Sequence, residues 1–276
     1  MTRAFVIGHP IAHSRSPLIH GHWLKTYGIP GSYEAIDVTP EALPQFFDRI
    51  RAGEFAGGNV TVPHKEAAFA LCDFQDVDTC HLKAFNTLST LPTSDGLMVY
   101  GQNTDLVGFL ANLDAAAPGW DEGRGRAIVL GAGGAARAVA AGLALRMGEV
   151  HVLNRTRARA EALVDDLAGG LRAGDLDDFA HLAESARLVV NTTTLGMHGT
   201  RFEGIDFSRL PRDAVVTDIV YVPLETPFLA EARRLGLRTV DGLGMLLHQA
   251  APGFALWFGV EPEVTADLRR LIEATL

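Results

Sequence analysis

A glycine-rich segment near the middle of the chain constrains its fold more than any other feature. An apolar run ends at Leu130 and is followed by Gly131-Ala132-Gly133-Gly134-Ala135-Ala136 and further alanines. In Gly131-x-Gly133-x-x-Ala136 the first glycine permits a tight strand-to-helix turn, and the second lets the backbone approach a pyrophosphate. The small third residue allows the helix to pack closely on its strand. The segment therefore predicts a Rossmann unit that binds a dinucleotide at a helix N-terminus.

The rest of the chain alternates strand-like and helix-like patterns, which predicts an α/β fold with mostly parallel sheets. Strands are expected at residues 3–8, 32–38, 57–62, 86–92, 97–102, 127–131, 149–154, 187–192, 214–220 and 238–240. Helices are expected from Ser16-Pro17 to Gly28 (with Ser16 as N-cap), at 41–52, after Pro63, from about Thr104 to Ala116, and at 226–235, 244–258 and 265–275.

At roughly 150 residues per domain, a chain of 276 residues corresponds to about 1.8 domains, so two are expected. We expect two α/β lobes, of which residues 105–242 form the Rossmann lobe that binds the dinucleotide. Residues 1–104, completed by the C-terminal helices 243–276, form the other lobe. The loop at 118–125, rich in Pro and Gly, is the strongest compositional signal of a boundary.

Charge and composition narrow the classes of partner. The net charge of −9 argues against a nucleic-acid partner, although a few local cations could still hold a small anion. The N-terminal apolar run is too short for a signal peptide, and no uncharged apolar stretch is long enough to span a membrane. Cys72 and Cys80 form no CxxC pair, and the histidines lack metal-ligand spacing. We expect a cytoplasmic protein without a metal, monomeric or homodimeric.

The residues after the expected strand 149–154 indicate which dinucleotide binds. Enzymes that use NAD usually carry Asp or Glu there for the ribose 2′-hydroxyl. Here the sequence is Asn154-Arg155-Thr156-Arg157-Ala158-Arg159, without a carboxylate. Guanidinium groups bind a 2′-phosphate through charge-assisted hydrogen bonds, so Arg155 and Arg159 favour NADP. Arg157 is interpreted as a solvated residue at a helix start.

Polar clusters mark the ends of elements in the first half of the chain. Ser14 and Ser16 lie at a helix start and could grip a carboxylate, although a plain N-cap would explain Ser16 alone. Lys65 falls in a first helical turn, where the helix dipole disfavours a cation; by position alone, a solvated surface lysine is the more common interpretation. Asp105 opens a helix whose dipole favours a carboxylate, and a simple helix-start acid is the alternative. Asn59 and Thr61 share one face of a strand.

These blocks, taken in order, resemble the shikimate dehydrogenase family along nearly the whole chain. The matching motifs are Pro10-Ile11-x-His13-Ser14-x-Ser16-Pro17, Gly58-Asn59-Val60-Thr61-Val62-Pro63-x-Lys65, Asn86-Thr87, Gly101-x-Asn103-Thr104-Asp105-x-x-Gly108-Phe109, Gly131-Ala132-Gly133-Gly134-Ala135, Asn154-Arg155-Thr156, Asn191-Thr192-Thr193, Asp218-x-x-Tyr221-x-Pro223-x-x-Thr226-Pro227-x-Leu229 and Gly242-x-Gly244-Met245-Leu246-x-x-Gln249-Ala250.

The resemblance implies reversible hydride transfer between NADP and the C3 carbinol of shikimate, giving 3-dehydroshikimate in aromatic amino-acid biosynthesis. It implies Lys65 and Asp105 as the catalytic pair. It implies Ser14 and Ser16 as ligands of the substrate carboxylate, and Thr61, Asn86, Gln249 and Tyr221 as further substrate ligands. The residues expected to bind the cofactor are Gly131, Ala132, Gly133, Gly134, Ala135, Asn154, Arg155, Thr156, Arg159, Thr192, Gly242 and Met245.

One departure from the family pattern lies beside a proposed substrate ligand. The family usually has Gly-Ala-x-Asn-Thr, whereas this chain has Lys83-Ala84-Phe85-Asn86-Thr87. Gly often supplies a backbone geometry that Lys adopts only at a cost, so the local loop, the activity or the substrate preference could differ. Two alternatives stay open: a quinate/shikimate dehydrogenase of broader substrate or cofactor use, and a non-catalytic homologue that senses the ligand.

Overall fold

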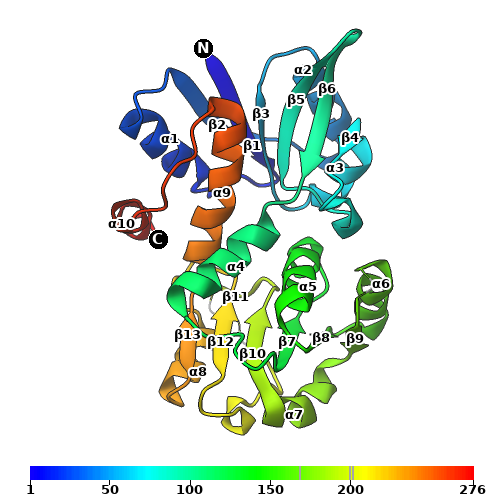
Figure 1. Ribbon diagram of the computed structural model, residues 1–276, viewed down its shortest axis with the longest axis vertical. Helices are drawn as coiled ribbons and strands as arrows, with labels where there is room; N and C mark the ends of the chain where they lie inside the picture. Colours follow the sequence, from blue (N-terminus) through cyan, green and yellow to red (C-terminus); the bar gives the residue numbers. More distant parts are fainter. Residues whose placement is uncertain (168, 199, 201) are drawn as a thin grey trace. The chain divides into compact units, whose positions relative to one another are not determined.

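The computed structural model describes residues 1–167, 169–198, 200 and 202–276, and its chain divides into two compact units (Figure 1). The first unit contains Met1–Thr104 and Leu247–Thr275, and the second contains Asp105–Leu246 with Leu276. The division falls between Thr104 and Asp105, so the loop at 118–125 lies inside the second unit and is not a boundary. The α/β fold class is confirmed in both units.

The first unit carries strands and helices from both ends of the chain. Its strands are β1 (Thr2–Gly8), β2 (Gly31–Asp37), β3 (Gly57–Val60), β4 (Phe74–Gln75), β5 (Thr87–Thr93) and β6 (Gly96–Gln102). Its helices are α1 (Ser16–Thr26), α2 (Leu43–Arg51), α3 (Lys65–Leu71), most of α9 (Leu243–Phe258) and α10 (Ala266–Glu273), with 3₁₀ turns at Pro40–Ala42 and Cys80–Leu82.

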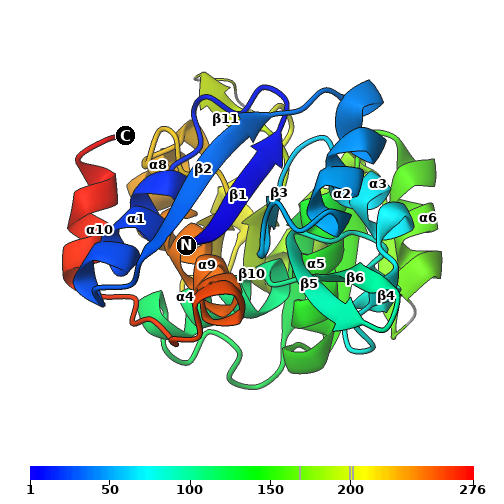
Figure 2. The same ribbon diagram turned by 90° about the horizontal axis from the view of Figure 1, so that it is seen from above.

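The sheet of the first unit has the order β2-β1-β3-β5-β6-β4 and is mixed, because β5 runs antiparallel to both β3 and β6. Alternate side chains of β1 face opposite sides. Phe5 and Ile7 pack into the core under α2, whereas Ala4 and Val6 pack against Trp257 of α9. Helices therefore cover both faces, and α1 lies beside α10 (Figure 2).

The second unit follows the βα rhythm that the sequence predicted. Its strands are β7 (Arg126–Leu130), β8 (Glu149–Leu153), β9 (Leu171–Gly174), β10 (Ala186–Asn191), β11 (Leu195–His198), β12 (Val215–Asp218) and β13 (Arg238–Val240). Its helices are α4 (Asp105–Ala116), α5 (Gly134–Arg146), α6 (Arg157–Leu167), α7 (Phe179–Leu182) and α8 (Pro227–Arg234), with 3₁₀ turns at Leu176–Asp178, Ala183–Ser185 and Phe207–Arg209.

The sheet of the second unit is parallel and has the order β13-β12-β10-β7-β8-β9. This is the strand order of the Rossmann fold, in which the chain starts at the central strand and winds outward to each side in turn. Ligands of such sheets bind outside the carboxyl ends of the strands, at the point where the winding reverses. Here that point is the end of β7, flanked by β8 and β10.

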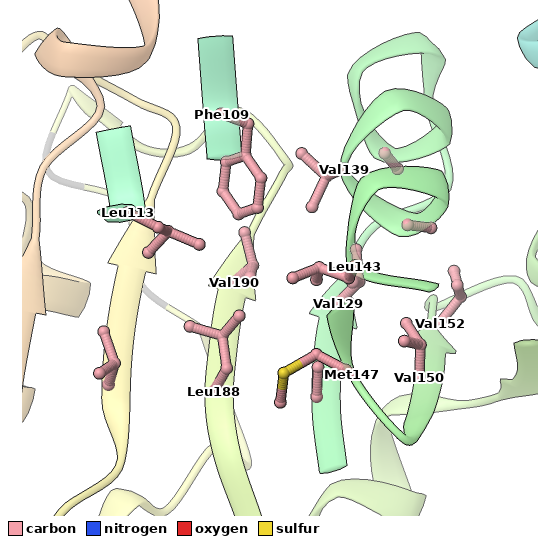
Figure 3. Close-up of a cluster of buried hydrophobic side chains, with 14 of the residues drawn as sticks. Phe109, Leu113, Val129, Val139, Leu143, Met147, Val150, Val152, Leu188 and Val190 are labelled. Carbon is pink, nitrogen blue, oxygen red and sulfur yellow. The ribbon is translucent and has the colours of Figure 1, made fainter. Parts of the chain in front are cut away.

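The core on one face of this sheet lies between the strands and helices α4 and α5 (Figure 3). Phe109 and Leu113 of α4 and Val139 and Leu143 of α5 point toward the valines and leucines of the strands, which include Val129, Val150, Val152, Leu188 and Val190. Each such side chain, once buried, contributes about 1.5–3 kcal/mol to folding. This packing holds α5 against β7 and its neighbouring strands.

Candidate active site

The glycine-rich turn after β7 has the geometry that a bound pyrophosphate requires. Gly131 has a φ of +112°, and a Cβ there would lie 2.7 Å from Thr192 Oγ1. An L side chain would therefore be strained and crowded at this position. A Cβ at Gly133, the N-cap of α5, would meet nothing within 4 Å. The space beside Gly133 is therefore open at the N-terminus of a 13-residue helix, where unpaired backbone N–H groups favour an anionic ligand.

Basic residues follow the neighbouring strand β8. Arg155 and Arg159 are exposed, and neither pairs with a carboxylate in the part of the chain that the structure describes. Arg157 is instead tied to Glu161 at 3.0 Å, which agrees with its interpretation as a solvated residue at the start of α6. Asn154 donates to the Thr156 carbonyl at 2.9 Å and shapes the turn. The two unpaired guanidinium groups fit a 2′-phosphate.

In the first unit, the turn before α1 carries Ser14 and Ser16. The prediction that Ser16 is the N-cap is wrong, because Arg15 occupies that position and Ser16 is the first helical residue. Ser14 Oγ accepts from the Ser16 N–H at 3.3 Å, so the two serines lie together. Arg15 fixes this turn by donating to the carbonyl of Thr275 at 2.6 Å.

Asn86 and Gln249 come together although 163 residues separate them in the sequence. Asn86 Nδ2 donates to Gln249 Oε1 at 3.1 Å, and Asn86 Oδ1 accepts from the Thr104 N–H at 2.7 Å. Thr104 Oγ1 in turn donates to the Gln249 carbonyl at 2.9 Å. All three residues are buried. The network orients the two predicted amide ligands and anchors the residue that directly precedes Asp105.

Sequence reasoning missed Tyr33, which extends this network toward the serines. Its hydroxyl donates to Asn59 Oδ1 at 2.6 Å and also contacts the Ser16 side chain. Asn59 Nδ2 donates to the Asn86 carbonyl at 3.1 Å, which joins Tyr33 to the network of Asn86. The rings of Tyr33 and His20 stack at 4.0 Å, and burial lowers the pKa of His20 to about 3, so that ring is neutral. Strand β2 gives no local sign of this role, because its partners are distant in sequence.

Lys65 and Thr61 flank the turn between β3 and α3. Lys65 is the first residue of α3, as predicted, and its carbonyl accepts from the Phe85 N–H at 2.9 Å, next to Asn86. The strand ends at Val60, two residues earlier than expected, so Thr61 lies beyond it and does not share a strand face with Asn59. Asp105 opens α4, as expected, and is 4% exposed.

Loops at the carboxyl edge of the second sheet carry the remaining predicted residues. Thr192 is buried, and its hydroxyl donates to the Leu130 carbonyl at 2.8 Å. Tyr221 is half-buried after β12. A Cβ at Gly242 would lie 2.4 Å from the Ile219 carbonyl oxygen, and Met245 is 8% exposed within the core. Close packing therefore accounts for these last two residues, whatever they contribute to a cofactor site.

Two kinds of feature are absent from the part of the chain that the structure describes. It contains no cluster of three or more His, Cys, Asp or Glu side chains arranged to hold a metal ion. It also contains no helix that is both long enough and apolar enough to cross a membrane.

The Rossmann sheet, its glycine turn and the arginines after β8 define a dinucleotide-dependent oxidoreductase that carries a second α/β unit. Family models match three parts of the chain. The shikimate dehydrogenase substrate binding domain matches residues 6–88, shikimate / quinate 5-dehydrogenase matches 120–225, and the shikimate 5′-dehydrogenase C-terminal domain matches 242–272. The chain belongs to the shikimate dehydrogenase family.

Individual relatives agree with this family over the full length. The shikimate dehydrogenase (NADP(+)) of Methylobacterium radiotolerans is 57% identical, covering 99% of this chain and 97% of its own. The structure of the Thermus thermophilus shikimate 5-dehydrogenase with NADP(H) and shikimate superposes with a TM-score of 0.88 at 39% identity, covering 100% of both chains. The Corynebacterium glutamicum quinate dehydrogenase with NAD has a TM-score of 0.88 at 30% identity, covering 100% and 99%.

Proposed function

We propose that this chain catalyses the reversible, NADP-dependent oxidation of shikimate to 3-dehydroshikimate, a step of aromatic amino-acid biosynthesis. The observation that carries this proposal is the match, over 99% of the chain, to a relative named shikimate dehydrogenase (NADP(+)). The class of enzyme, an oxidoreductase acting on a CH–OH group with NADP, follows from the same matches.

The cofactor is assigned to the residues around the end of β7. Gly131 to Ala135 offer backbone N–H groups to the pyrophosphate, and Arg155 and Arg159 offer guanidinium groups to the 2′-phosphate. When bound, NADP supplies the hydride chemistry of the reaction. Support for NADP over NAD comes from the absence of a carboxylate at 154–159, where an acidic side chain would repel the extra phosphate.

Substrate binding is assigned to polar groups of the first unit, with Tyr221 from the second. The hydroxyls of Ser14 and Ser16 donate to the carboxylate of shikimate. The amides of Asn86 and Gln249 bind ring hydroxyls, and Thr61 adds a further hydroxyl contact. The hydrogen bonds among Asn86, Gln249 and Thr104 support this assignment, because they hold both amides in fixed orientations before a ligand arrives.

Proton transfer is assigned to Lys65 and Asp105. Oxidation of a secondary alcohol requires a group that takes the hydroxyl proton, and the reverse reaction requires a donor beside the carbonyl oxygen. An ammonium group and a carboxylate near one oxygen can exchange that proton and stabilise the charge that develops on it. Lys65 begins α3 next to the backbone of Phe85, and Asp105 directly follows the anchored Thr104, which supports a precise placement of both.

Steady-state kinetics tests the assignment of the reaction and of Lys65. The purified chain is assayed with shikimate and with quinate, each with NADP and with NAD, at the absorbance of the reduced cofactor. We expect turnover of shikimate with NADP to dominate. Lys65→Ala should lower kcat by roughly 10²–10⁴, the usual scale for losing an acid–base group. A change confined to KM would mean that Lys65 only binds substrate.

Lys25→Ala is the matched control, because Lys25 is an exposed lysine in the last turn of α1 and should leave kcat unchanged. Comparable turnover of quinate would favour an enzyme of broader substrate range. This outcome is tested because the chain is also similar to a quinate dehydrogenase. Turnover of neither acid would favour a ligand-sensing homologue.

The cellular setting belongs to the same proposal. We place the enzyme in the cytoplasm, where NADP is available and where two unpaired cysteines remain reduced. We expect a monomer or a homodimer. Cell fractionation tests the location, and light scattering coupled to size-exclusion chromatography tests the oligomeric state.

A further inference from the structure

Two loops that leave the carboxyl edge of the second sheet meet at one buried carboxylate. Asn191 ends β10 and Asp218 ends β12, and the two residues are direct partners in the register of these parallel strands. Both are 0% exposed, and Asn191 Nδ2 donates to Asp218 Oδ1 at 2.9 Å. The reaction outlined above uses neither side chain, although the Asp218 motif was part of the family resemblance.

The first loop is fixed through Asn191. Asn191 Oδ1 accepts from the Thr193 N–H at 2.9 Å and from Thr193 Oγ1 at 2.8 Å. Asn191 Nδ2 donates to the Leu195 carbonyl at 2.8 Å. Together these bonds hold the segment 192–195, which begins with Thr192 and lies against Gly131 of the glycine turn.

The second loop is fixed by Asp218 itself. Asp218 Oδ1 accepts from the Val220 N–H at 2.9 Å, and Oδ2 accepts from Thr226 Oγ1 at 2.7 Å. These two bonds bracket Tyr221. Thr226 is also the N-cap of α8, where its hydroxyl accepts from the Leu229 N–H at 3.3 Å.

Asp218 thus accepts from the Asn191 amide, which in turn holds the first loop, and from the Val220 N–H and the Thr226 hydroxyl of the second loop. A carboxylate accepts all three bonds without needing to donate. An amide of the same shape would present an N–H group to one of them. We propose that Asp218 is a positioning residue that holds the cofactor segment 192–195 and the Tyr221 segment 219–226 in register, so that nucleotide and substrate affinity share one anchor. This inference deepens the proposed function and rests on the roles it gives to Thr192 and Tyr221.

Titration calorimetry on substituted chains tests the shared anchor. NADP affinity is measured first, and shikimate affinity is then measured with saturating NADPH, which cannot react with an alcohol. Thr226→Val removes both the bond to Asp218 on the Tyr221 side and the cap of α8, so shikimate affinity should fall about tenfold while NADP affinity stays within about twofold. Asp218→Asn weakens the bonds to both loops, so both affinities should fall, each by about threefold or more. Thr226→Ser keeps the hydroxyl and should restore shikimate affinity.

Thr265→Val is the matched control, because Thr265 is the N-cap of α10 and accepts from the Leu268 N–H at 3.2 Å without contact to a buried carboxylate. It should lower the thermal midpoint through the loss of a cap alone, and change neither affinity. If Thr226→Val also lowers only the midpoint, or if Asp218→Asn affects one ligand alone, the proposal is overturned. A wild-type chain that binds NADP but not shikimate would instead contradict the proposed function.

Hydrogen exchange in the wild-type chain gives a test that needs no substitution. Because Asp218 joins the two loops, NADP binding should slow amide exchange in peptides covering 219–226 as well as those covering 191–195. Protection confined to 191–195 would overturn the shared anchor, even if both variants failed to fold.

Discussion

Lys83 occupies a backbone conformation that favours glycine, and replacing it should stabilise the first unit. Its φ of 50° and ψ of 27° are left-handed, and its N–H closes the 3₁₀ turn Cys80–Leu82 by donating to the Cys80 carbonyl at 3.1 Å. This conformation destabilises the folded chain by about 1–2 kcal/mol for a non-glycine residue. A glycine removes that strain, but it also makes the unfolded chain more flexible, which lowers the stability by about 0.4–1 kcal/mol. Lys83→Gly should therefore raise the free energy of unfolding by about 0.5–1 kcal/mol.

Urea unfolding and scanning calorimetry measure this gain, which corresponds to about 1–3 °C in thermal midpoint. Lys83→Ala removes the same side chain but retains the Cβ, so it should give no gain. Arg124→Gly relieves the same kind of strain in the second unit, where φ is 47°, and should stabilise that unit. Equal stabilities of Lys83→Gly and Lys83→Ala would refute the reasoning.

Lys83→Gly also tests whether Lys83 affects the turnover of shikimate. Lys83 already holds a left-handed conformation, which glycine adopts without steric cost, and the next residue is held by Asn103 Nδ2, which donates to the Ala84 carbonyl at 2.6 Å. We therefore expect Lys83→Gly to leave kcat/KM for shikimate within about twofold. A larger change would show that Lys83 alters the loop before Asn86 beyond its own backbone.

Three further substitutions probe the second unit. Gly131→Ala would place a Cβ 2.7 Å from the Thr192 hydroxyl in left-handed backbone, so NADP affinity by calorimetry should fall by about tenfold or more; an unchanged affinity would contradict the close approach. Arg155→Asp should weaken NADP binding far more than NAD binding, and equal losses would remove Arg155 from the 2′-phosphate site. Burial raises the pKa of Asp218 from 3.8 to about 6, so from about pH 4 to 6 the folded chain keeps a proton that the unfolded chain releases. The unfolding free energy of the wild type, relative to Asp218→Asn, should therefore fall by about 3 kcal/mol over that range in urea titrations, and a flat difference would reject the assignment.

Local patterns predicted most of the strands and helices, including the three-residue edge strand β13, but missed β4, β9 and β11. The strand expected at 238–240 is β13, and Thr226 caps α8 directly before Pro227, because apolar runs and capping residues act within a few positions. The edge strands β4 (Phe-Gln) and β9 (Leu-Arg-Ala-Gly) were not predicted, since neither segment has a run of β-branched residues and both pair with strands remote in sequence. Ser16 was misassigned as N-cap because the helix begins one residue earlier than the serine pattern suggested.

Some residues of the candidate site could be predicted from the sequence and others could not. The glycine turn and the start of α3 could be placed from sequence, because a motif of adjacent residues defines each. Tyr33 could not, since its only signal is a hydroxyl whose partner Asn59 lies 26 residues away on another strand. Asn191 and Asp218 were noticed only as family motifs, and their pairing depends on the register of β10 against β12.

The discontinuous first unit has a consequence for the order in which the enzyme matures. A ribosome delivers the chain from its N-terminus, so every strand of this sheet emerges early, whereas α9 and α10 emerge last. Only then does the Trp257 indole reach the Leu88 carbonyl, 2.8 Å away, and cover the face around Ala4 and Val6. The second unit runs without interruption from Asp105 to Leu246, so it can fold before the C-terminal helices of the first unit have been synthesised. The half of the enzyme that is synthesised first is therefore the half that is completed last.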